Sequence, residues 1–400
     1  MATSIEIKSI DRMKDPKKFE KEFILFPWKI YRSKENAEKP WAKAWCPPLI
    51  LDHLDRFNRD KNVKLRRIEY EAFVAYRNGE AVGRITAQIN KGHLETFHDD
   101  CGFFGYFECV EDKDVAHALL NHAMEWCKAR GVKKIRGPFN FSINDDWGFK
   151  CDCGPDFPGN FETMPMIYQP HNPPYYNDFV LSWGMHKVQD HYAYHLDMSK
   201  GLSEKMVRVA DYIEKKAEKS VGGITYRHAE LPKWEREVEL VKEIHANAWE
   251  ANWGTVPITQ DELDQDGKDL KMIIDPRFVW FVFVKGEVAG FIMGIPDINE
   301  VQSKINGRLF PFGLLKLLWQ VKVRRRWKRG RCILLGMKKK FQGKGLEAPL
   351  IVRLFKVGRS IGVDHVELSW IVESNLKMRK EIEPFTDGVW MSYRAYEKMI

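Results

Sequence analysis

The feature that most constrains the fold of this 400-residue chain is a repeat of its first half in its second half. In the first half, Asn78-Gly79 lies between two alternating apolar runs, a pattern that predicts a β-hairpin. In the second half, Lys285-Gly286 lies between similar runs, so that Gly290 takes the place of Gly83. Two further pairs of segments follow in the same order: Gly131-Val132 with Gly362-Val363, and Tyr192-Ala193-Tyr194 with Tyr393-Arg394-Ala395-Tyr396. A repeat of this length indicates a duplicated domain.

The order of elements within each half predicts the fold class. Each half has a strand, a helical region, a two-strand hairpin, and then strands alternating with helices. Such an order predicts the α/β class, with a mixed twisted sheet in each domain and helices on both of its faces. We therefore predict two tandem domains, residues 1–200 and 201–400, with an insertion at residues 300–330 of the second.

Composition excludes several classes of protein. With 44% hydrophobic and 30% charged residues, the chain is globular rather than disordered. No apolar run reaches membrane-spanning length, and the N-terminus lacks a signal-peptide core, so we expect a cytoplasmic protein. The seven cysteines form no paired framework, and Cys151-Asp152-Cys153 offers too few ligands for zinc, so we predict reduced thiols and no metal.

A glycine-rich turn in the second half is the best candidate for a binding site. Residues 333–335 are an apolar run short enough for a buried strand, and residues 342–345 form the turn. Apolar residues at helical spacing follow from Leu346. A turn of this kind directs unpaired N–H groups at one point and binds phosphate. The first half has three acidic residues and no glycine at the corresponding turn, residues 109–115, so it predicts no such site.

The turn carries a resemblance to a known family. Gln342-Gly343-Lys344-Gly345-Leu346 resembles the acyl-CoA pyrophosphate loop of the GNAT N-acetyltransferases, Gln/Arg-x-x-Gly-x-Gly/Ala, although Glu347 occupies the last small position. The resemblance implies two GNAT-like domains, the first degenerate, and an acyl-CoA co-substrate, with acetyl-CoA expected. The implied donor-binding residues are Gln342, Gly343, Lys344, Gly345 and Leu346 of the loop, Gly336, Met337 and Lys338 of the preceding strand, and Asn375 beside the pantetheine arm. Asn375 is equally well explained as a helix cap.

Acyl transfer from a thioester to an amine requires an uncharged amine, a polarised carbonyl and a proton for the thiolate. The candidate bases are Glu367 and Glu373, near the end of a predicted strand. The candidate acids are Tyr393 and Tyr396. The family often uses a tyrosine near the late helix, and no tyrosine lies between Asn375 and Phe385.

Two other segments suggest contacts with partners. We predict that Asn247, Trp249, Asn252 and Trp253 line the acceptor pocket, although a helix that packs its tryptophans in the core explains them as well. Residues 310–331 join leucines and Trp319 to a basic cluster, which suits an acidic acyl carrier or an anionic membrane surface. An ordinary packed helix followed by a basic loop is the alternative.

The predicted function is an N-acyltransferase with its site in the second domain and a small-molecule or peptide amine as acceptor. One alternative is an aminoacyl-tRNA-dependent transferase, since peptidoglycan aminoacyl transferases duplicate the same fold. The basic stretch from Lys316 to Lys340 would then bind the RNA backbone, but the glycine loop argues for CoA instead, so we expect no nucleic-acid partner. The other alternative is a non-catalytic protein that binds acyl-CoA or an acyl carrier, favoured by Glu347 and the missing acid.

Overall fold

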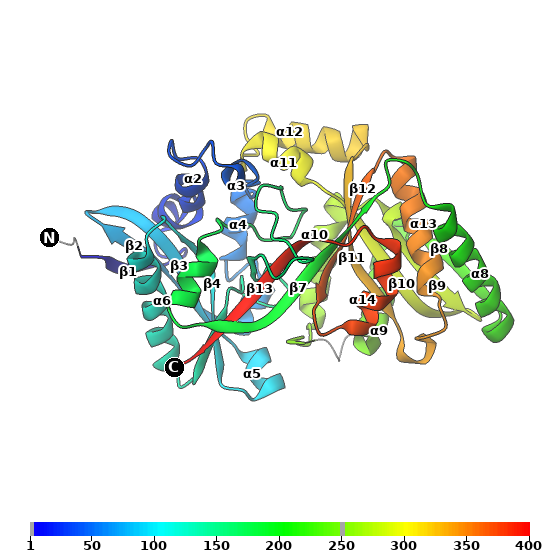
Figure 1. Ribbon diagram of the computed structural model, residues 1–400, viewed down its shortest axis with the longest axis horizontal. Coiled ribbons are helices and arrows are strands. Elements are labelled where there is room, and N and C mark those ends of the chain that lie inside the picture. Colours follow the sequence, from blue (N-terminus) through cyan, green and yellow to red (C-terminus); the bar gives the residue numbers. More distant parts are fainter. Residues whose placement is uncertain (1–3, 249–252) are drawn as a thin grey trace. The chain divides into compact units, whose positions relative to one another are not determined.

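The computed structural model describes residues 4–248 and 253–400, and the chain divides into two compact units (Figure 1). Unit 1 contains Met1–Tyr192, Gln302–Leu314 and Trp390–Ile400, and unit 2 contains Ala193–Val301 and Leu315–Val389. The units therefore differ from consecutive halves, because the last eleven residues and part of the insertion belong to unit 1. The boundary near residue 200 stays a prediction about the duplication.

Unit 1 is built on a mixed sheet. Its strand order is β1 (Glu6–Ile10), β2 (Ile68–Arg77), β3 (Glu80–Asn90), β4 (Cys101–Cys109), β5 (Lys134–Gly137) and β13 (Val389–Met399), with β6 (Phe149–Lys150) also on β13. β4 and β5 are parallel, and the other pairs are antiparallel. The helices of this unit are α1 (Pro16–Phe19), α2 (Phe26–Tyr31), α3 (Pro40–Lys43), α4 (Ile50–Arg56), α5 (Lys91–Phe97), α6 (Lys113–Lys128) and α7 (Tyr176–Ser182).

The core of unit 1 lies on both faces of this sheet. Phe73 and Ala75 of β2 pack with the apolar face of α6, whereas Val74 belongs to a second cluster with Phe19 and Phe57 near α1 and α4. Successive residues of a strand point to opposite faces, so the alternation buries both sides. The predicted sheet with helices on both faces is confirmed.

Unit 2 has the strand order β12 (His365–Val372), β11 (Arg329–Met337), β10 (Glu287–Pro296), β9 (Val279–Val284) and β8 (Ile224–His228). Only β11 and β12 are parallel among these pairs. The helices are α8 (Glu204–Val221), α9 (Trp234–Ala248), α10 (Gln260–Ile273), α11 (Asn299–Ile305), α13 (Glu347–Ser360) and α14 (Leu376–Ile382). α12 (Gly313–Leu318) and β7 (His186–Asp197) are each divided between the two units.

The two hairpins confirm the repeat, residue by residue. Asn78-Gly79 and Lys285-Gly286 all have positive φ, as a two-residue hairpin turn requires. Val110 N–H donates to Val82 O at 3.0 Å, and Lys338 N–H donates to Ala289 O at 2.9 Å, so the same cross-strand bond closes both copies.

Each hairpin turn is followed by a glycine, Gly83 or Gly290, at a position where the surroundings leave little room for a side chain. A Cβ on Gly290 would lie 2.6 Å from Gly336 O of the neighbouring strand. A Cβ on Gly83 would lie 3.2 Å from Glu108 O, the equivalent atom, and 2.6 Å from Leu119 Cδ1 of α6. Both positions are therefore too crowded for an unstrained side chain. The pairing of Gly83 with Gly290 therefore reflects shared geometry as well as shared sequence.

Candidate acyl-donor site

The site begins where the two parallel strands of unit 2 part. β11 pairs with β12 only from Arg329, opposite His365, to Cys332, opposite Leu368. Beyond Cys332, β11 continues along β10 as far as Met337. The edge of β11 that faces β12 is therefore open over residues 333–337.

Main-chain groups on this open edge follow from the ladder on the other side. Because Lys338 N–H donates to Ala289 O, the alternation of an antiparallel ladder directs the N–H of Leu335 and Met337 away from β10. Met337 O accepts a hydrogen bond from Gln342 Nε2 at 3.1 Å on that side. Of the three predicted strand residues, Met337 thus offers main-chain groups to the opening, whereas the Lys338 N–H is used by the sheet.

Lys338 has a second structural role. Its side chain is buried, and Nζ lies 2.5 Å from Glu243 Oε1 and 3.2 Å from Glu287 Oε1. Lys340 also pairs with Glu287, at 2.6 Å. These ion pairs tie the start of the turn to α9 and β10.

The turn itself needs both of its glycines, for different reasons. Gly343 has φ +71° and Gly345 has φ +77°, which L side chains rarely adopt. A Cβ on Gly343 would meet nothing within 4 Å, whereas one on Gly345 would lie 2.5 Å from Ile213 Cγ2 of α8. Gly345 therefore also packs the turn against α8, and Gly343 faces open space.

The helices that follow the two copies of this strand differ at their N-termini. α6 is capped by its own chain: Asp112 Oδ1 accepts the N–H of Asp114 at 2.9 Å and of Val115 at 3.3 Å. α13 begins after Leu346, whose side chain makes no capping hydrogen bond. The N-terminus of α13 can accept an anion, and that of α6 is already occupied by a carboxylate.

Charges around the turn mostly suit an anion. Lys344 is exposed, with Nζ 5.4 Å from the centre of the Phe341 ring. Glu347, in the first turn of α13, is the charge that opposes an anion. Burial raises the pKa of Glu347, so its charge is easier to lose than that of an exposed glutamate.

A buried polar trio lies where the strands part. Glu367 is 0% exposed, and its Oε1 lies 3.5 Å from Arg331 Nε, its neighbour across the parallel ladder. Arg331 Nε donates to Ser369 Oγ at 2.7 Å, and Ser369 Oγ donates to Glu367. One predicted base thus lies at the inner end of the opening, with a cation and a hydroxyl beside it.

Two other predicted residues of unit 2 lie just past β12. Glu373 is half-buried, and its carbonyl oxygen accepts a hydrogen bond from Arg379 at 3.3 Å. Asn375 Oδ1 accepts the N–H of Met378 at 3.2 Å, so this side chain caps α14 as the alternative explanation predicted.

The predicted acids, Tyr393 and Tyr396, lie in unit 1. Tyr393 is fully buried and stacks on His191 at 4.7 Å, and Tyr396 OH donates to Asn177 Oδ1 at 2.8 Å. The reason is the course of β13, which pairs antiparallel with β5 of unit 1.

The structure describes two of the four predicted acceptor residues. Trp249 and Asn252 lie outside the described residues. Asn247 belongs to α9, and Trp253 is half-buried. Their role in an acceptor pocket stays a prediction.

Tyr194 is a candidate that the sequence pattern did not reveal. It lies in the part of β7 that belongs to unit 2, where its hydroxyl donates to Glu383 Oε1 at 2.9 Å and accepts from Arg379 Nε at 3.0 Å. It therefore brings a tyrosine to α14, the late helix that has none in its own sequence. Burial raises the pKa of Tyr194 to about 12, so it stays protonated at neutral pH. The repeated Tyr192-Ala193-Tyr194 segment was the only signal in the sequence.

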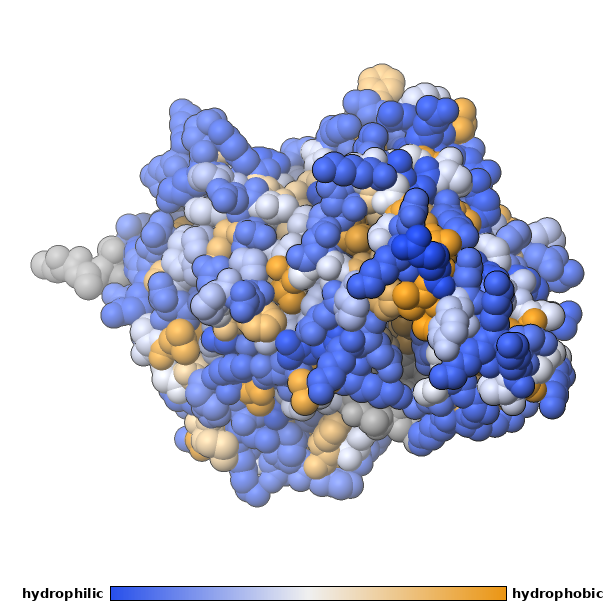
Figure 2. Space-filling model, turned by 45° about the vertical axis from the view of Figure 1, so that its right-hand side comes forward, coloured by the Kyte–Doolittle hydropathy of each residue, from blue (hydrophilic) through white to orange (hydrophobic). Residues whose placement is uncertain are grey.

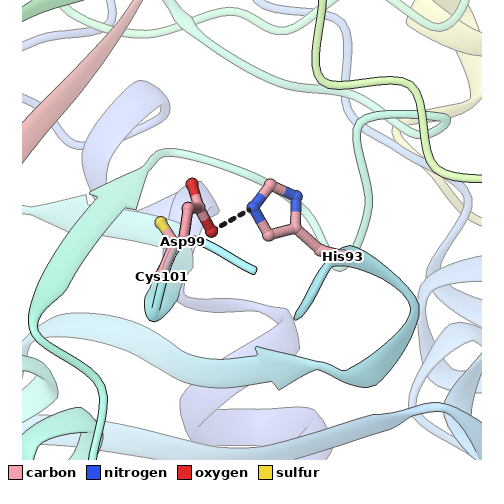
Figure 3. Close-up of side chains that lie close together, drawn as sticks. All are labelled: His93, Asp99 and Cys101. Carbon is pink, nitrogen blue, oxygen red and sulfur yellow. Dashed lines mark hydrogen bonds and ion pairs between the residues drawn. The ribbon is translucent and has the colours of Figure 1, made fainter. Parts of the chain in front are cut away.

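A group of potential metal ligands lies in unit 1 (Figure 3). The ligand atoms of His93, Asp99 and Cys101 lie within 4.8 Å of one another, and His93 Nε2 is 3.0 Å from Asp99 Oδ1. Asp99 is already paired with Lys134 at 3.1 Å, and burial raises the pKa of the Cys101 thiol to about 12. In the structure these side chains belong to a hydrogen-bonded ion-pair network around Asp99.

Unit 1 has a buried glutamate, Glu108, at the position where unit 2 has Gly336 of β11. Glu108 is paired with Arg84 in the β3–β4 ladder, as Gly336 is paired with Phe291 in unit 2. Tyr176 OH donates to Glu108 Oε2 at 2.7 Å. Burial raises the pKa of Glu108 to about 7. The two copies therefore differ at this ladder position, with a buried carboxyl in unit 1 and a glycine in unit 2.

The raised pKa predicts a pH dependence of stability. Because the folded-state pKa of Glu108 exceeds the ordinary 4.5, folding favours the protonated form, and stability falls as pH rises from about 4.5 through about 7. Relative to Glu108→Gln, the wild-type free energy of unfolding should drop by up to about 3 kcal/mol over this range and then level off. Denaturant unfolding at pH 5, 6, 7 and 8 tests this. Glu111→Gln, an exposed neighbour, should change with pH as the wild type does, and a pH-independent difference for Glu108→Gln would contradict the assignment.

Comparison with known proteins agrees with this fold. No protein-family model matches the chain. The tandem GNAT protein from the clavulanic acid biosynthesis pathway has a TM-score of 0.55 and 11% identity, over 99% of this chain and 98% of that one. A glucosamine N-acetyltransferase region of a fungal β-N-acetylglucosaminidase has a TM-score of 0.54, covering 38% of that chain. The chain therefore has the fold of a tandem GNAT protein.

Two curated proteins are similar over nearly the whole chain. Bacterial ceramide synthase of Caulobacter vibrioides is 34% identical over 391 residues, which are 95% of this chain and 94% of that protein. Protein YghO of Escherichia coli is 31% identical over 385 residues, 95% of this chain and 93% of that protein. The chain belongs to the family that contains these two proteins.

Proposed function

We propose that this protein is an acyl-CoA-dependent N-acyltransferase whose acceptor is a long-chain amino alcohol of the sphingoid type. The observation that carries the proposal is the open edge of β11, which leads through a glycine turn to α13, a helix with no side-chain cap. In unit 1 the corresponding helix, α6, is capped by the carboxylate of Asp112. The acceptor is suggested by bacterial ceramide synthase, since a ceramide is the amide of a long-chain base.

The donor would lie along the opening. N–H groups of residues 343–346 are proposed to bind the pyrophosphate at the N-terminus of α13, with Lys344 beside them. The N–H groups of Leu335 and Met337 and the C=O group of Leu335 would pair with the amides of the pantetheine arm. The five residues 333–337 span about 16 Å. This is the distance along β11 between the proposed phosphate site and the trio of Glu367, Arg331 and Ser369.

The reaction forms one C–N bond and breaks one C–S bond. We assign Glu367 the role of base, accepting the proton that the amine nitrogen loses as it attacks the thioester carbon. Arg331 and Ser369 hold the carboxylate in position. The thiolate that leaves needs a proton, for which Tyr194 is the proposed donor in place of Tyr393. Glu373 stays the alternative base.

Acetyl-CoA was the expected donor, and the proposed acceptor widens this to acyl-CoAs of any chain length. A cytoplasmic location stays a proposal, consistent with seven free thiols. Residues 310–331 keep two proposed partners, an acidic acyl carrier and an anionic membrane surface.

The proposal is tested by incubating the full-length protein with acetyl-CoA or palmitoyl-CoA and sphinganine in detergent. We expect release of free thiol together with an N-acyl product found by mass spectrometry. Serine, an amino alcohol without the long chain, is the control acceptor and should be a poor one. Binding of acyl-CoA with no product from any amine would support the non-catalytic alternative instead.

A further inference from the structure

Exposed apolar side chains are concentrated in one short segment. Six of the fifteen exposed large hydrophobic residues in the described part of the chain lie within residues 310–323. These six are Phe310 (69% exposed), Phe312 (66%), Leu315 (62%), Leu318 (45%), Trp319 (54%) and Val323 (68%). Figure 2 shows apolar surface among hydrophilic side chains at the top of the view, where α11 and α12 lie in Figure 1.

The apolar residues occupy the outer face of a helix. The segment continues from α12 into a π-helical turn, Trp319–Arg324. Leu315, Trp319 and Val323 follow one another at four-residue spacing and are all exposed, whereas Gly313 and Gln320 are buried. A surface helix normally turns its apolar stripe towards the core. This one turns it outwards, so its apolar face is available to a partner.

Basic residues alternate with the apolar ones along this segment of the sequence. Residues 301–346 contain no aspartate or glutamate and fourteen lysines and arginines. Arg325 and Lys328 pair with Asp275 and Asp364, at 2.8 and 2.7 Å. Lys316, Lys322 and Arg326 are exposed and contact no carboxylate among the described residues.

These two properties together indicate the partner. An acidic carrier protein would form ion pairs with the lysines, but it offers no hydrocarbon interior in which six large apolar side chains could be buried. A bilayer with anionic headgroups satisfies both, because aromatic and aliphatic side chains enter the acyl boundary while lysine and arginine stay among the phosphates. No helix in the described parts of the chain is long and apolar enough to cross a membrane, so the segment would lie in the interface.

We propose that residues 310–326 dock this protein on an anionic bilayer surface, with Leu315, Trp319 and Val323 inserted and Lys316 and Lys322 on the headgroups. The docking goes beyond the proposed function, since it depends on neither the glycine turn nor the trio. It would bring the enzyme to the phase in which a long-chain amine dissolves.

Vesicle cosedimentation of the full-length protein tests the docking. We expect binding to phosphatidylcholine–phosphatidylglycerol vesicles, weaker binding in high salt, and little binding to pure phosphatidylcholine. The double variant Leu315→Gln/Trp319→Gln should lose about tenfold or more in partition coefficient, and Lys316→Gln/Lys322→Gln a similar amount at low salt. The control Tyr212→Gln/Met272→Gln removes two equally exposed apolar residues elsewhere and should bind as the wild type does.

Failure of the docking and of the proposed function can be told apart. Equal binding of the Leu315→Gln/Trp319→Gln variant and the wild type, or no binding of the wild type to anionic vesicles, overturns the docking. Binding to an acidic acyl carrier protein that anionic vesicles do not displace overturns it as well. The variants should keep full activity in detergent with soluble substrates, whereas an inactive wild type that still binds vesicles would refute only the acyltransferase.

Discussion

Replacing Glu367 with glutamine is expected to lower kcat by about 10²- to 10⁴-fold, with a much smaller change in KM for the acyl donor. Glutamine keeps the shape and can still accept the hydrogen bond from Ser369, but it cannot take the proton from the attacking amine. Steady-state kinetics with the acyl donor and the amine varied in turn measures both constants. Glu373→Gln is the matched control, and a larger loss there would move the base to Glu373.

The structural cost of this change must be separated from its chemical effect. Glu367→Gln leaves the buried Arg331 without its partner, which costs about 3–5 kcal/mol when one member of a buried pair is removed. The double variant Arg331→Gln/Glu367→Gln removes both charges, and we expect it to recover most of the melting temperature while staying inactive. Recovered activity in the double variant would show that Glu367 serves only stability.

Local features of the fold were predictable because their causes are local. The turns at Asn78-Gly79 and Lys285-Gly286 follow from backbone preferences of two residues each. α6 is likewise specified locally, by the Asp112 cap and a run of apolar residues at helical spacing. The glycine turn before α13 is predictable for the same reason.

Pairing between distant segments was not predictable from such signals. The pattern of β13 indicates a strand, but nothing in it shows that Glu397 lies beside Arg136, where the two side chains form an ion pair in unit 1. The register of β11 on β12, which brings Arg331 to Glu367, is hidden for the same reason. Tyr194 and its partner Arg379 in α14 are 185 residues apart along the chain. Only the tertiary structure brings the proposed acid to this helix.

The glycine turn offers the sharpest test of donor binding, and the structure selects the position. A side chain at Gly345 would collide with Ile213, so a loss of binding there would also report damage to packing. Gly343 faces open space at φ +71°, a conformation that asparagine and aspartate tolerate better than other L residues. The pair Gly343→Asp and Gly343→Asn therefore shares one shape and one backbone cost, and the two variants differ only in charge.

Gly343→Asp should raise the Kd for acyl-CoA about five- to several-hundredfold over Gly343→Asn, because a carboxylate about 4 Å from a phosphate costs about 1–4 kcal/mol in a partly screened site. Calorimetric titration with acyl-CoA measures this. Acyl-pantetheine, which lacks the pyrophosphate, is the matched ligand and should bind both variants equally. If both variants bound acyl-CoA equally well, the pyrophosphate would not lie at this turn. The open edge of β11 would then have to bind a donor whose phosphates lie elsewhere or that has none.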